Sequence, residues 1–413
     1  MSKLQELINK LCPNGVEFKP LGDISNLSRG KVYGKDYISE HRGEYPVFSS
    51  QTVNDGELGK IDTYDYDGFY LTWTTDGAYA GTIFYRQGKF SITNVCGLIS
   101  LKVNFINLKF LYYWLSIEAP KHVYYGMGNP KLMSNQMTSI MIPVPPIEVQ
   151  EEIVRILDSF SDYAAELQAE LQARKQQYEY YRNLLLTFNP SAYGCGTDDE
   201  QKDGVTTWEG RNYKIEWKKL GEIGTFIRGK RFVRTDIMEQ GVPCIHYGDM
   251  YTYYGLYTNN TPTFLKEEKA QKMRFAQKND IVIVAAGENK DDLGNAVAWL
   301  GEKPAAVHDA CFIFRSNLYP NYISHICRSH NYHKQIKMFA NEAKICSVSG
   351  QDLQKVLIPV PEYELQIKIA SILDRFETLV NDLTNGLPAE IAAVKDQYEY
   401  YRNKLLTFKK LSA

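Results

Sequence analysis

The sequence predicts a mixed α/β protein with an internal pseudo-twofold duplication, in which two globular domains are separated by an antiparallel, coiled-coil-like pair of long α-helices. Three observations support this fold class: long segments recur at nearly constant offsets, the repeats end in heptad-patterned stretches, and strand and turn signals fill the residues between them. We expect five regions: a first globular domain at 1–145, a central helical region at 146–188, a linker at 189–214, a second globular domain at 215–357 and a C-terminal helical region at 358–413.

The duplication is clearest at the two ends of each half. The heptapeptide QYEYYRN occurs at 177–183 and again at 397–403. Before it, the segments IPVP and ILD are found in both halves at an offset of 216 residues, and VEFKPLGDISNLSRGK at 16–31 matches IEWKKLGEIGTFIRGK at 215–230. Between these anchors the similarity fades. The two halves therefore share a frame and differ in their middles.

The middle segments carry the composition of mixed α and β structure. They are rich in Tyr, Gly and Thr, and they contain β-like runs such as GLISL at 97–101 and DIVIV at 280–284. Turn signals such as Asn54-Asp55-Gly56 and Asp67-Gly68 separate the runs. We therefore expect each middle to fold as a globular domain with its own sheet.

A heptad pattern follows the first IPVP segment. Apolar residues alternate in steps of four and three from Ile153 to Phe188, and only Arg174 departs from the series. This spacing is typical of a helix that packs lengthwise on another helix. A continuous helix of this length would extend about 50 Å at ~1.5 Å per residue.

The second heptad stretch contains a stutter. Its apolar positions run from Ile369 to Phe408, but two steps of four follow each other at Leu383, Leu387 and Ile391. Pro388 lies in this interval and cannot donate a helical hydrogen bond. The pattern therefore predicts a kink or short break, with a second helix that begins near Pro388.

Two similar amphipathic helices in one chain can bury each other's apolar stripe if they pair antiparallel. The expected helix–helix seam comprises Leu157, Phe160, Leu167, Leu171, Tyr178, Tyr181, Leu373, Phe376, Tyr398 and Tyr401. Other side chains of the repeated heptapeptide point away from that stripe and are candidates for docking a partner: Tyr180, Arg182, Tyr400 and Arg402. In the alternative arrangement, each helix packs only on its own domain.

A finer repeat, AELQAELQ, occupies residues 165–172. Four helical residues add ~6 Å of length, which is close to two base-pair steps of ~3.4 Å. The repeat could therefore set a distance along a duplex. The alternative is a solvated helix of high intrinsic propensity with no measuring role.

Composition and motifs point to a binding protein. The net charge is −2, the two globular stretches are neutral to mildly basic, and the helical stretches are acidic. Seven cysteines without a CxxC pair indicate reduced thiols, and no run approaches ~20 apolar residues, so we expect a cytosolic protein with no membrane association. Enzyme signatures such as the P-loop, GxSxG and HExxH are missing from the sequence. We expect no catalytic residue, metal or cofactor site.

Two similar frames with unlike middles can read two different targets at a set separation. On DNA these would be two half-sites. Basic and aromatic residues near the repeated RGK segments are the expected contacts: Arg29, Lys31, Tyr33 and Lys35 in the first half, and Arg228, Lys230, Arg231 and Arg234 in the second. The alternative for each is an ordinary solvated side chain.

The combination of LCPNGV at 11–16, the paired IPVP and ILD segments and the two QYEYYRN helices resembles the specificity subunit of type I restriction-modification enzymes. The resemblance implies two target recognition domains that each read half of a split site in double-stranded DNA. It implies two modification subunits that bind S-adenosylmethionine, and restriction subunits that use ATP. It also implies that the number of four-residue repeats in the central helix correlates with the length of the unread DNA spacer. The insertion around Gly386 and Pro388 makes the two helical regions unequal, which departs from this plan.

Two other function classes remain open. One is a complete methyltransferase or nuclease with a diverged site, which labelled S-adenosylmethionine and DNA would reveal with the purified chain alone. The other is a scaffold that holds two protein partners and no DNA. A mobility-shift assay with the modification subunit present separates this scaffold from a DNA reader.

Overall fold

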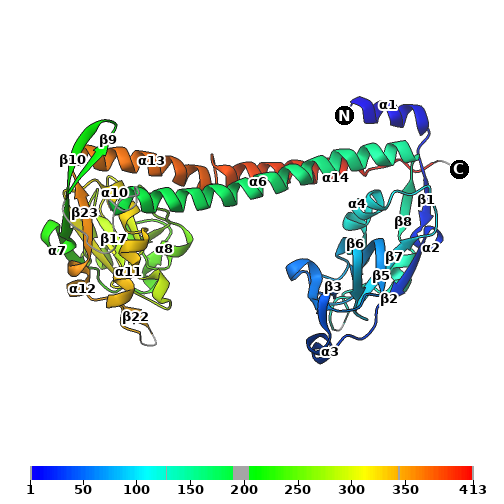
Figure 1. The fold of residues 1–413 in the computed structure, drawn as a ribbon, viewed down its shortest axis with the longest axis horizontal. Coiled ribbons are helices and arrows are strands. Elements are labelled where there is room, and N and C mark those ends of the chain that lie inside the picture. The colour runs from blue at the N-terminus through cyan, green and yellow to red at the C-terminus, as the bar shows by residue number, and fades with distance from the viewer. Residues whose placement is uncertain (1, 127, 189–203, 343–344, 412–413) are drawn as a thin grey trace. The chain divides into compact units, whose positions relative to one another are not determined.

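The computed structural model describes residues 2–126, 128–188, 204–342 and 345–411. The chain divides into two compact units (Figure 1): unit 1 contains residues 1–168 and 390–413, and unit 2 contains residues 169–389. Each unit has its own sheets and its own apolar core. The predicted mixed α/β class, with a long helix between two domains, is confirmed.

Unit 1 is built around one mainly antiparallel sheet. Its six strands are ordered β2-β7-β5-β6-β3-β4, and β1 and β8 form a separate two-stranded ribbon. The strands are β1 (Glu17–Pro20), β2 (Ser25–Arg29), β3 (Arg42–Phe48), β4 (Glu57–Ile61), β5 (Tyr66–Thr74), β6 (Ile83–Ile92), β7 (Cys96–Leu101) and β8 (Met141–Val144). The short helices are α1 (Ser2–Leu11), α2 (Leu21–Ile24), α3 (Lys35–Glu40), α4 (Leu108–Glu118) and α5 (Ser134–Thr138).

Unit 2 contains two five-stranded sheets, ordered β11-β21-β17-β19-β14 and β12-β15-β13-β20-β16. The strands are β9 (Gly204–Trp208), β10 (Arg211–Lys219), β11 (Gly224–Arg228), β12 (Ile237–Met238), β13 (Val242–Ile245), β14 (Tyr257–Thr258), β15 (Thr263–Leu265), β16 (Phe275–Ala276), β17 (Ile281–Val284), β18 (Ala286–Gly287), β19 (Ala296–Trp299), β20 (Ala305–Val307), β21 (Cys311–Ser316), β22 (Cys346–Ser347) and β23 (Leu357–Pro361). The short helices are α7 (Leu220–Ile223), α8 (Asp249–Thr252), α9 (Glu267–Ala270), α10 (Pro320–Ile326), α11 (His330–Phe339) and α12 (Gly350–Lys355).

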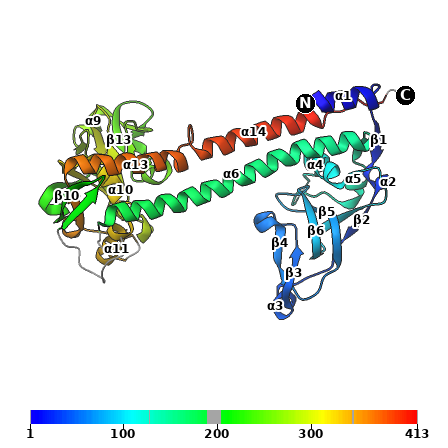
Figure 2. The same ribbon diagram turned by 45° about the horizontal axis from the view of Figure 1, so that its top comes forward.

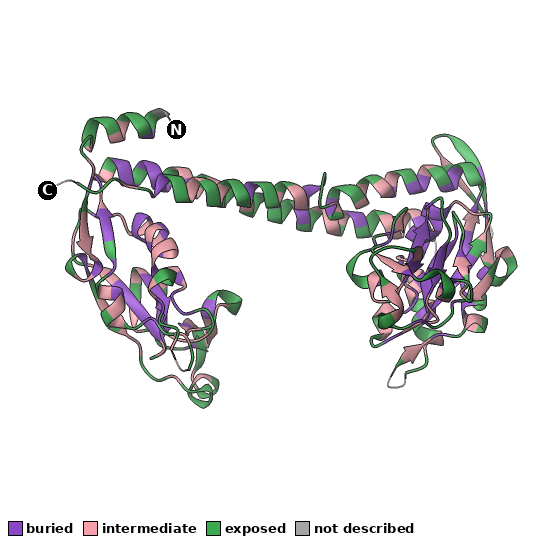
Figure 3. Cartoon of the chain, turned by 180° about the vertical axis from the view of Figure 1, so that it is seen from behind, coloured by how far each residue is buried: buried purple, intermediate pink, exposed green. Residues whose placement is uncertain are grey.

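The two β-like runs of the sequence are strands β7 and β17, as predicted. All four residues of β17 are buried, because apolar layers cover both faces of this central strand. Figure 3 shows this pattern, with buried residues gathered in the strands and exposed residues along the outer faces of the helices. The Asp67-Gly68 turn prediction is wrong: both residues lie inside β5, where Gly68 faces Gly88 of β6.

The first heptad stretch forms one helix, α6 (Ile147–Thr187), of 41 residues. The second stretch forms two helices, α13 (Tyr363–Asn381) and α14 (Leu387–Leu405), so the predicted break before Pro388 is confirmed. Asp382 ends α13, and its Oδ1 accepts hydrogen bonds from the backbone N–H groups of Thr384 and Asn385 at 2.7 and 3.2 Å. A Cβ at Gly386 would lie 2.4 Å from Thr378 O, so only glycine fits this turn.

Within unit 1, the first part of α6 pairs antiparallel with α14. Phe160 stacks on Tyr401 with ring centroids 5.5 Å apart, and the Tyr163 hydroxyl donates to Glu390 Oε1 at 2.6 Å. Leu157 and Leu405 share a buried cluster with residues of α1 and α4. The two helices lie side by side in both Figure 1 and Figure 2. The sequence-predicted pairing is therefore present here.

Within unit 2, the second part of α6 pairs antiparallel with α13. Tyr178 and Tyr181 both stack on Phe376, with centroids 6.2 and 5.6 Å apart. Leu383 is an apolar position of the second heptad series but is 80% exposed, because it lies in the break after α13. At the end of α6 the first heptad series includes Leu185, but the buried residue is Leu186, because a 3.6-residue helix drifts against a strict heptad.

Each IPVP segment is a strand that pairs with the start of its own half. β8 pairs antiparallel with β1, and β23 pairs antiparallel with β10. Residues 204–214, the last part of the expected linker at 189–214, form β9, a turn and the start of β10. Glu209 and Gly210 both have positive φ and close this hairpin. The earlier part of the linker, with Cys195, lies outside the described residues.

Candidate nucleic-acid interface and helical seam

In unit 1 the RGK segment, residues 29–31, starts at the last residue of β2 and lies beside the turn at 93–96, in which the Cys96 N–H donates to Thr93 O at 3.0 Å. The Lys31 N–H donates to Ile92 O at 3.1 Å, and the Gly30 N–H donates to Cys96 O at 3.4 Å. The Thr93 N–H donates to Phe48 O at 2.8 Å. These bonds tie the turn to the ends of β3 and β6, which are parallel neighbours.

In unit 2 the second RGK segment, residues 228–230, starts at the last residue of β11 and lies beside the turn at 308–311, in which the Cys311 N–H donates to His308 O at 3.0 Å. The Lys230 N–H donates to Val307 O at 2.9 Å, and the Gly229 N–H donates to Cys311 O at 3.0 Å. The His308 N–H donates to Ile245 O at 3.2 Å. The neighbouring strands, β13 and β20, are again parallel. We call this arrangement the turn frame, made of the RGK segment with residues 48–50 and 92–96 in unit 1 and with residues 245–247 and 307–311 in unit 2.

Glycine is required at the centre of both RGK segments. A Cβ at Gly30 would lie 1.9 Å from Ile92 O, and a Cβ at Gly229 would lie 2.1 Å from His308 O. No side chain can be accommodated at such distances without moving the backbone. The RGK repeat therefore preserves a close approach between two chain segments.

The arginines of the two turns support the backbone. Arg29 Nη1 donates to Asn94 O at 3.2 Å, and Arg228 Nε donates to Asp309 O at 3.0 Å. Arg29 also lies 5.9 Å from the Trp73 ring centroid, and burial lowers its pKa. Arg29 and Arg228, which were both predicted to contact DNA, therefore stabilise the turn frame through these hydrogen bonds. Arg228 is also exposed.

The other predicted contacts in unit 1 gather beside the turn. Lys31 is exposed and forms an ion pair with Asp65, which raises the pKa of the lysine. The Tyr33 hydroxyl donates to the same carboxylate at 2.6 Å. Lys35 begins α3 and is exposed. A phosphate at Lys31 would therefore compete with Asp65 for the ammonium group.

In unit 2 Lys230, Arg231 and Arg234 are exposed around the turn. Positive charge on Arg231 and Arg234 contributes to lowering the pKa of His308 and His246, respectively, after the larger effect of burial. Sequence reasoning missed another exposed cation, Arg274, whose Nη1 donates to Arg228 O at 2.7 Å. No repeat or motif marks Arg274, and only the fold brings it to the turn.

A glutamine anchors the start of each long helix to its domain. Gln150 Nε2 donates to Pro145 O at 2.7 Å, and its Oε1 accepts from the Asn107 N–H at 2.8 Å. Gln366 Nε2 donates to Pro361 O at 2.9 Å, and its Oε1 accepts from the Tyr319 N–H at 2.9 Å. Both glutamines are buried with all these groups satisfied.

The aspartate of each ILD segment contacts the same domain about two turns further along the helix. Asp158 accepts from Tyr113 Oη and Lys109 Nζ, both at 2.6 Å. Asp374 accepts from Asn321 Nδ2 at 2.9 Å and contacts His325 Nε2 at 2.8 Å. The repeated aspartates therefore keep one role, although their partners on α4 and α10 differ.

The seam residues differ in burial. Leu157, Leu167, Leu171, Tyr178 and Leu373 are buried, and Phe160, Phe376, Tyr398 and Tyr401 are half-buried. Tyr181 is 36% exposed, because only one face of its ring is covered by Phe376. Among the predicted docking residues, Tyr180 and Tyr400 are exposed. Arg182 and Arg402 instead lie over the Tyr178 and Tyr398 rings, at 5.2 and 5.3 Å.

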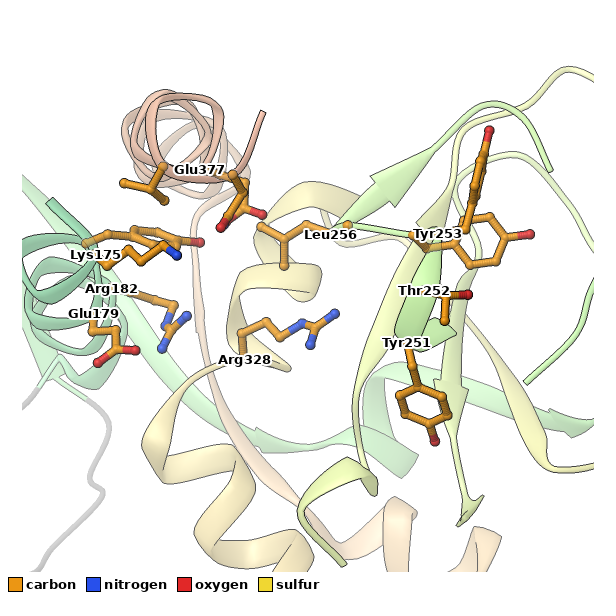
Figure 4. A pocket seen from close by; sticks show the side chains of 14 residues that line it. Lys175, Glu179, Arg182, Tyr251, Thr252, Tyr253, Leu256, Arg328 and Glu377 are labelled. Carbon is orange, nitrogen blue, oxygen red and sulfur yellow. The ribbon is translucent and has the colours of Figure 1, made fainter. Parts of the chain in front are cut away.

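A cleft of about 540 Å³ lies in unit 2 between α6, α13, the end of α8 and residues 253–256. Figure 4 shows Arg182 and Arg328 in it, with Glu377 on the α13 side. Burial lowers the pKa of Arg328, and Glu377 opposes that shift. Arg328 Nη1 donates to Asn295 Oδ1 at 2.9 Å. The cleft thus contains a mixed set of charges next to the seam.

Among the described residues, no group of three or more His, Cys, Asp or Glu side chains could hold a metal ion. Cys96, Cys244, Cys311 and Cys327 are buried free thiols, and Cys12 and Cys346 are half-buried. In the part of the chain with described structure, no helix is long and apolar enough to cross a membrane.

Comparison with known proteins gives one consistent result. A model of the type I restriction modification DNA specificity domain matches residues 13–174 and 213–393. A putative type I specificity subunit of Mycoplasma pneumoniae is 31% identical over 385 residues, which cover 93% of this chain and 95% of that protein. The specificity subunit of the type I restriction enzyme MpnII, from the same organism, is 43% identical over 190 residues, 45% of this chain and 57% of its own length.

Two solved structures share the fold. The S subunit of a type I restriction-modification system from M. genitalium superposes with a TM-score of 0.53 at 15% identity, covering 96% of this chain and 97% of that chain. A chain from work on complex assembly and conformational transition of the type I restriction-modification system gives a TM-score of 0.58 at 15% identity, covering 96% and 98%.

Proposed function

Because this chain belongs to the type I restriction-modification DNA specificity family, we propose that it is the non-catalytic subunit that reads a bipartite target in double-stranded DNA. Each unit would read one half-site through its turn frame. The helical region would set the spacer between the half-sites. We place its action in the cytoplasm, together with its DNA.

The observation that carries this proposal is the repetition of the turn frame. Two units with unlike middles keep the same backbone hydrogen bonds around an RGK turn. Each turn is bordered by exposed cations, Lys31 and Lys35 in unit 1 and Lys230, Arg231 and Arg234 in unit 2. Cations that contact phosphate position a protein on a duplex, and neighbouring side chains then read the bases.

The partners would be two modification subunits, which dock on the helical regions, and restriction subunits. We propose Tyr180 and Tyr400 as docking residues, because both project from the repeated heptapeptide and are 63% and 59% exposed. This chain would bind no cofactor. S-adenosylmethionine and ATP would be held by the modification and restriction subunits.

Binding of the chain, assembled with its modification subunits, to duplexes of random and of genomic sequence tests the proposal. We expect Lys31→Ala and Arg231→Ala to weaken binding and to reduce its salt dependence, because each removes a phosphate contact. Lys102→Ala is a matched control, since its ammonium is held by Gly22 O at 2.7 Å away from the turn. Unchanged affinity of the Lys31 and Arg231 variants at physiological salt would remove both residues from the interface.

A complete enzyme with a diverged active site is the second candidate. The purified chain alone, incubated with DNA and labelled S-adenosylmethionine, would then transfer methyl groups. We expect no transfer without the modification subunits. A scaffold that holds two proteins without DNA is the third candidate, and loss of all DNA binding by the assembled complex would favour it.

A further inference from the structure

The two turn frames carry different side chains at matched backbone positions. Phe48 and Ile245 each accept the matched frame hydrogen bond, so the residues that follow them, Ser49 and His246, occupy equivalent positions. Thr93 and His308 are equivalent for the same reason, because each donates that bond. A constant backbone with variable side chains is the arrangement by which a rigid scaffold changes specificity.

In unit 1 the matched positions hold small hydroxyl side chains. Thr93 Oγ1 donates to Ser49 Oγ at 3.1 Å, and Thr93 is only 3% exposed. Ser50 and Asn94 lie beside them, half-buried and exposed. This part of the frame therefore carries hydroxyl and amide groups.

In unit 2 the same positions hold rings that pack against one another in tilted and edge-to-face pairs. The His246 and His308 centroids lie 5.1 Å apart, and Tyr247 lies 4.6 Å from His246. Phe232, which is buried, packs edge-on against His308 at 5.0 Å. Phe232 is buried, whereas His246 is half-buried and Tyr247 is 36% exposed. His246 and Tyr247 are therefore accessible to a bound molecule.

Hydrogen bonds fix which ring atoms are available. His308 Nδ1 accepts from the Ala310 N–H at 3.1 Å, and its Nε2 donates to Phe232 O at 3.1 Å, so both nitrogens are used. His246 Nδ1 accepts from the Gly248 N–H at 3.1 Å. Its Nε2–H forms no hydrogen bond within the described ranges of the chain. Burial lowers the pKa of both imidazoles, which keeps them neutral at physiological pH.

We propose that His246 and Tyr247 select bases in the half-site read by unit 2, and that Ser49 and Ser50 do so at the matched positions of unit 1. The inference rests on the proposed function. The His246 Nε2–H would donate to a major-groove acceptor, such as N7 or O6 of guanine, N7 of adenine or O4 of thymine. The exposed Arg231 and Arg234, whose charges act on His308 and His246, would hold the adjacent phosphates.

Sequencing of methylated sites at base resolution tests the assignment, with the full chain assembled with its modification subunits in cells. The informative variants are His246→Ser, which installs the residue of the matched position, the reciprocal Ser49→His, and Tyr247→Phe, which removes one hydroxyl. His330→Gln is the control, because His330 is an exposed histidine of the same unit at the start of α11.

We expect His246→Ser to lose discrimination by about tenfold at one or more positions of a single half-site, as for the loss of one specific base contact. Ser49→His should alter only the other half-site, and His330→Gln neither. Unfolding midpoints of the variants show whether each one folds. If His246→Ser does not fold, Tyr247→Phe provides the test. Wild-type preference at every position, in folded variants, would overturn the assignment. A wild-type complex without any bipartite motif would instead overturn the proposed function, and the assignment with it.

Discussion

His325 Nε2 lies 2.8 Å from Asp374 Oδ1, and the imidazole is fully buried between α10 and α13. Because Nε2 donates to the carboxylate, Nδ1 can accept from the Tyr178 hydroxyl, which lies 3.2 Å away. One side chain thus connects the domain of unit 2 to α6 and α13. The equivalent link in unit 1 is made by Tyr113 and Asp158.

Replacing His325 with alanine should destabilise unit 2. The change removes two buried hydrogen bonds and leaves a cavity and an unsatisfied tyrosine hydroxyl, which together cost about 2–5 kcal/mol. Chemical denaturation followed by tyrosine and tryptophan fluorescence measures the loss. His330→Ala on the same unit should change the unfolding free energy by less than ~0.5 kcal/mol. Equal effects of the two substitutions would contradict a role for the buried link.

Tyr178 and Tyr181 should differ as determinants of seam stability, although both stack on Phe376. Tyr178 is 5% exposed, whereas Tyr181 is 36% exposed. We expect Tyr178→Ala to cost about 3–5 kcal/mol, as for other buried aromatics, and Tyr181→Ala clearly less. Urea denaturation of the two variants under one condition provides the comparison. A larger loss for Tyr181 would show that the seam extends beyond the contacts described above.

The turn frame should not tolerate a side chain at its centre. Gly30→Ala and Gly229→Ala each force a Cβ to about 2 Å from a carbonyl oxygen, so we expect the turn to move and stability to fall by about 1–3 kcal/mol. Gly34→Ala is the matched control, because nothing lies within 4 Å of its Cβ position. DNA binding by the assembled complex should fall with the first two variants and stay constant with the third. Normal binding by Gly30→Ala would show that the turn does not position the interface.

The features that the sequence predicts well are local. α6 follows from an unbroken heptad, and the break before α14 follows from Pro388 and from one extra step of four. The IPVP segments are predicted as domain boundaries because they recur intact. Each of these features depends on residues that are neighbours along the chain, where periodicity and backbone restrictions act directly.

The matched frame positions were not predictable in the same way. His246 corresponds to Ser49 only through the hydrogen bonds of residues 245 and 308, and insertions in the middles change the offset between the halves from one segment to the next. Arg274 reaches the RGK segment from the residue before β16, where the sequence carries no repeat signal. Charge and proximity in sequence single out the RGK segments as candidates, but they do not show that Arg29 and Arg228 donate hydrogen bonds to the backbone there.

Unit 2 should lose stability as the pH falls from about 6.5 to about 4. Burial, followed by the positive charge of Arg328, lowers the pKa of His333 to about 4, and Lys337 and Arg182 act in the same direction, while a hydrogen bond with the Cys327 backbone opposes them. Between its folded and unfolded pKa values the histidine takes up a proton only when unfolded, so stability rises with pH across this window. The full effect is at most roughly 3 kcal/mol. His333→Gln should flatten the unfolding free energy between pH 4 and 6.5, and an unchanged slope would contradict this explanation.

Deleting Ala169 to Gln172 should shorten the spacer that the complex accepts and leave both half-site sequences unchanged. The four residues are one copy of the AELQ repeat within α6, and their loss removes ~6 Å of helix, about two base-pair steps, with a rotation of only ~40°. Base-resolution mapping of methylated sites measures the spacer directly. The double variant Glu170→Ala, Gln172→Ala keeps the helix length and should keep the spacer, because the prediction depends on length and not on these side chains. Retention of the original spacing by the deletion variant, in a folded complex that still methylates DNA, would rule out α6 as the element that sets the distance.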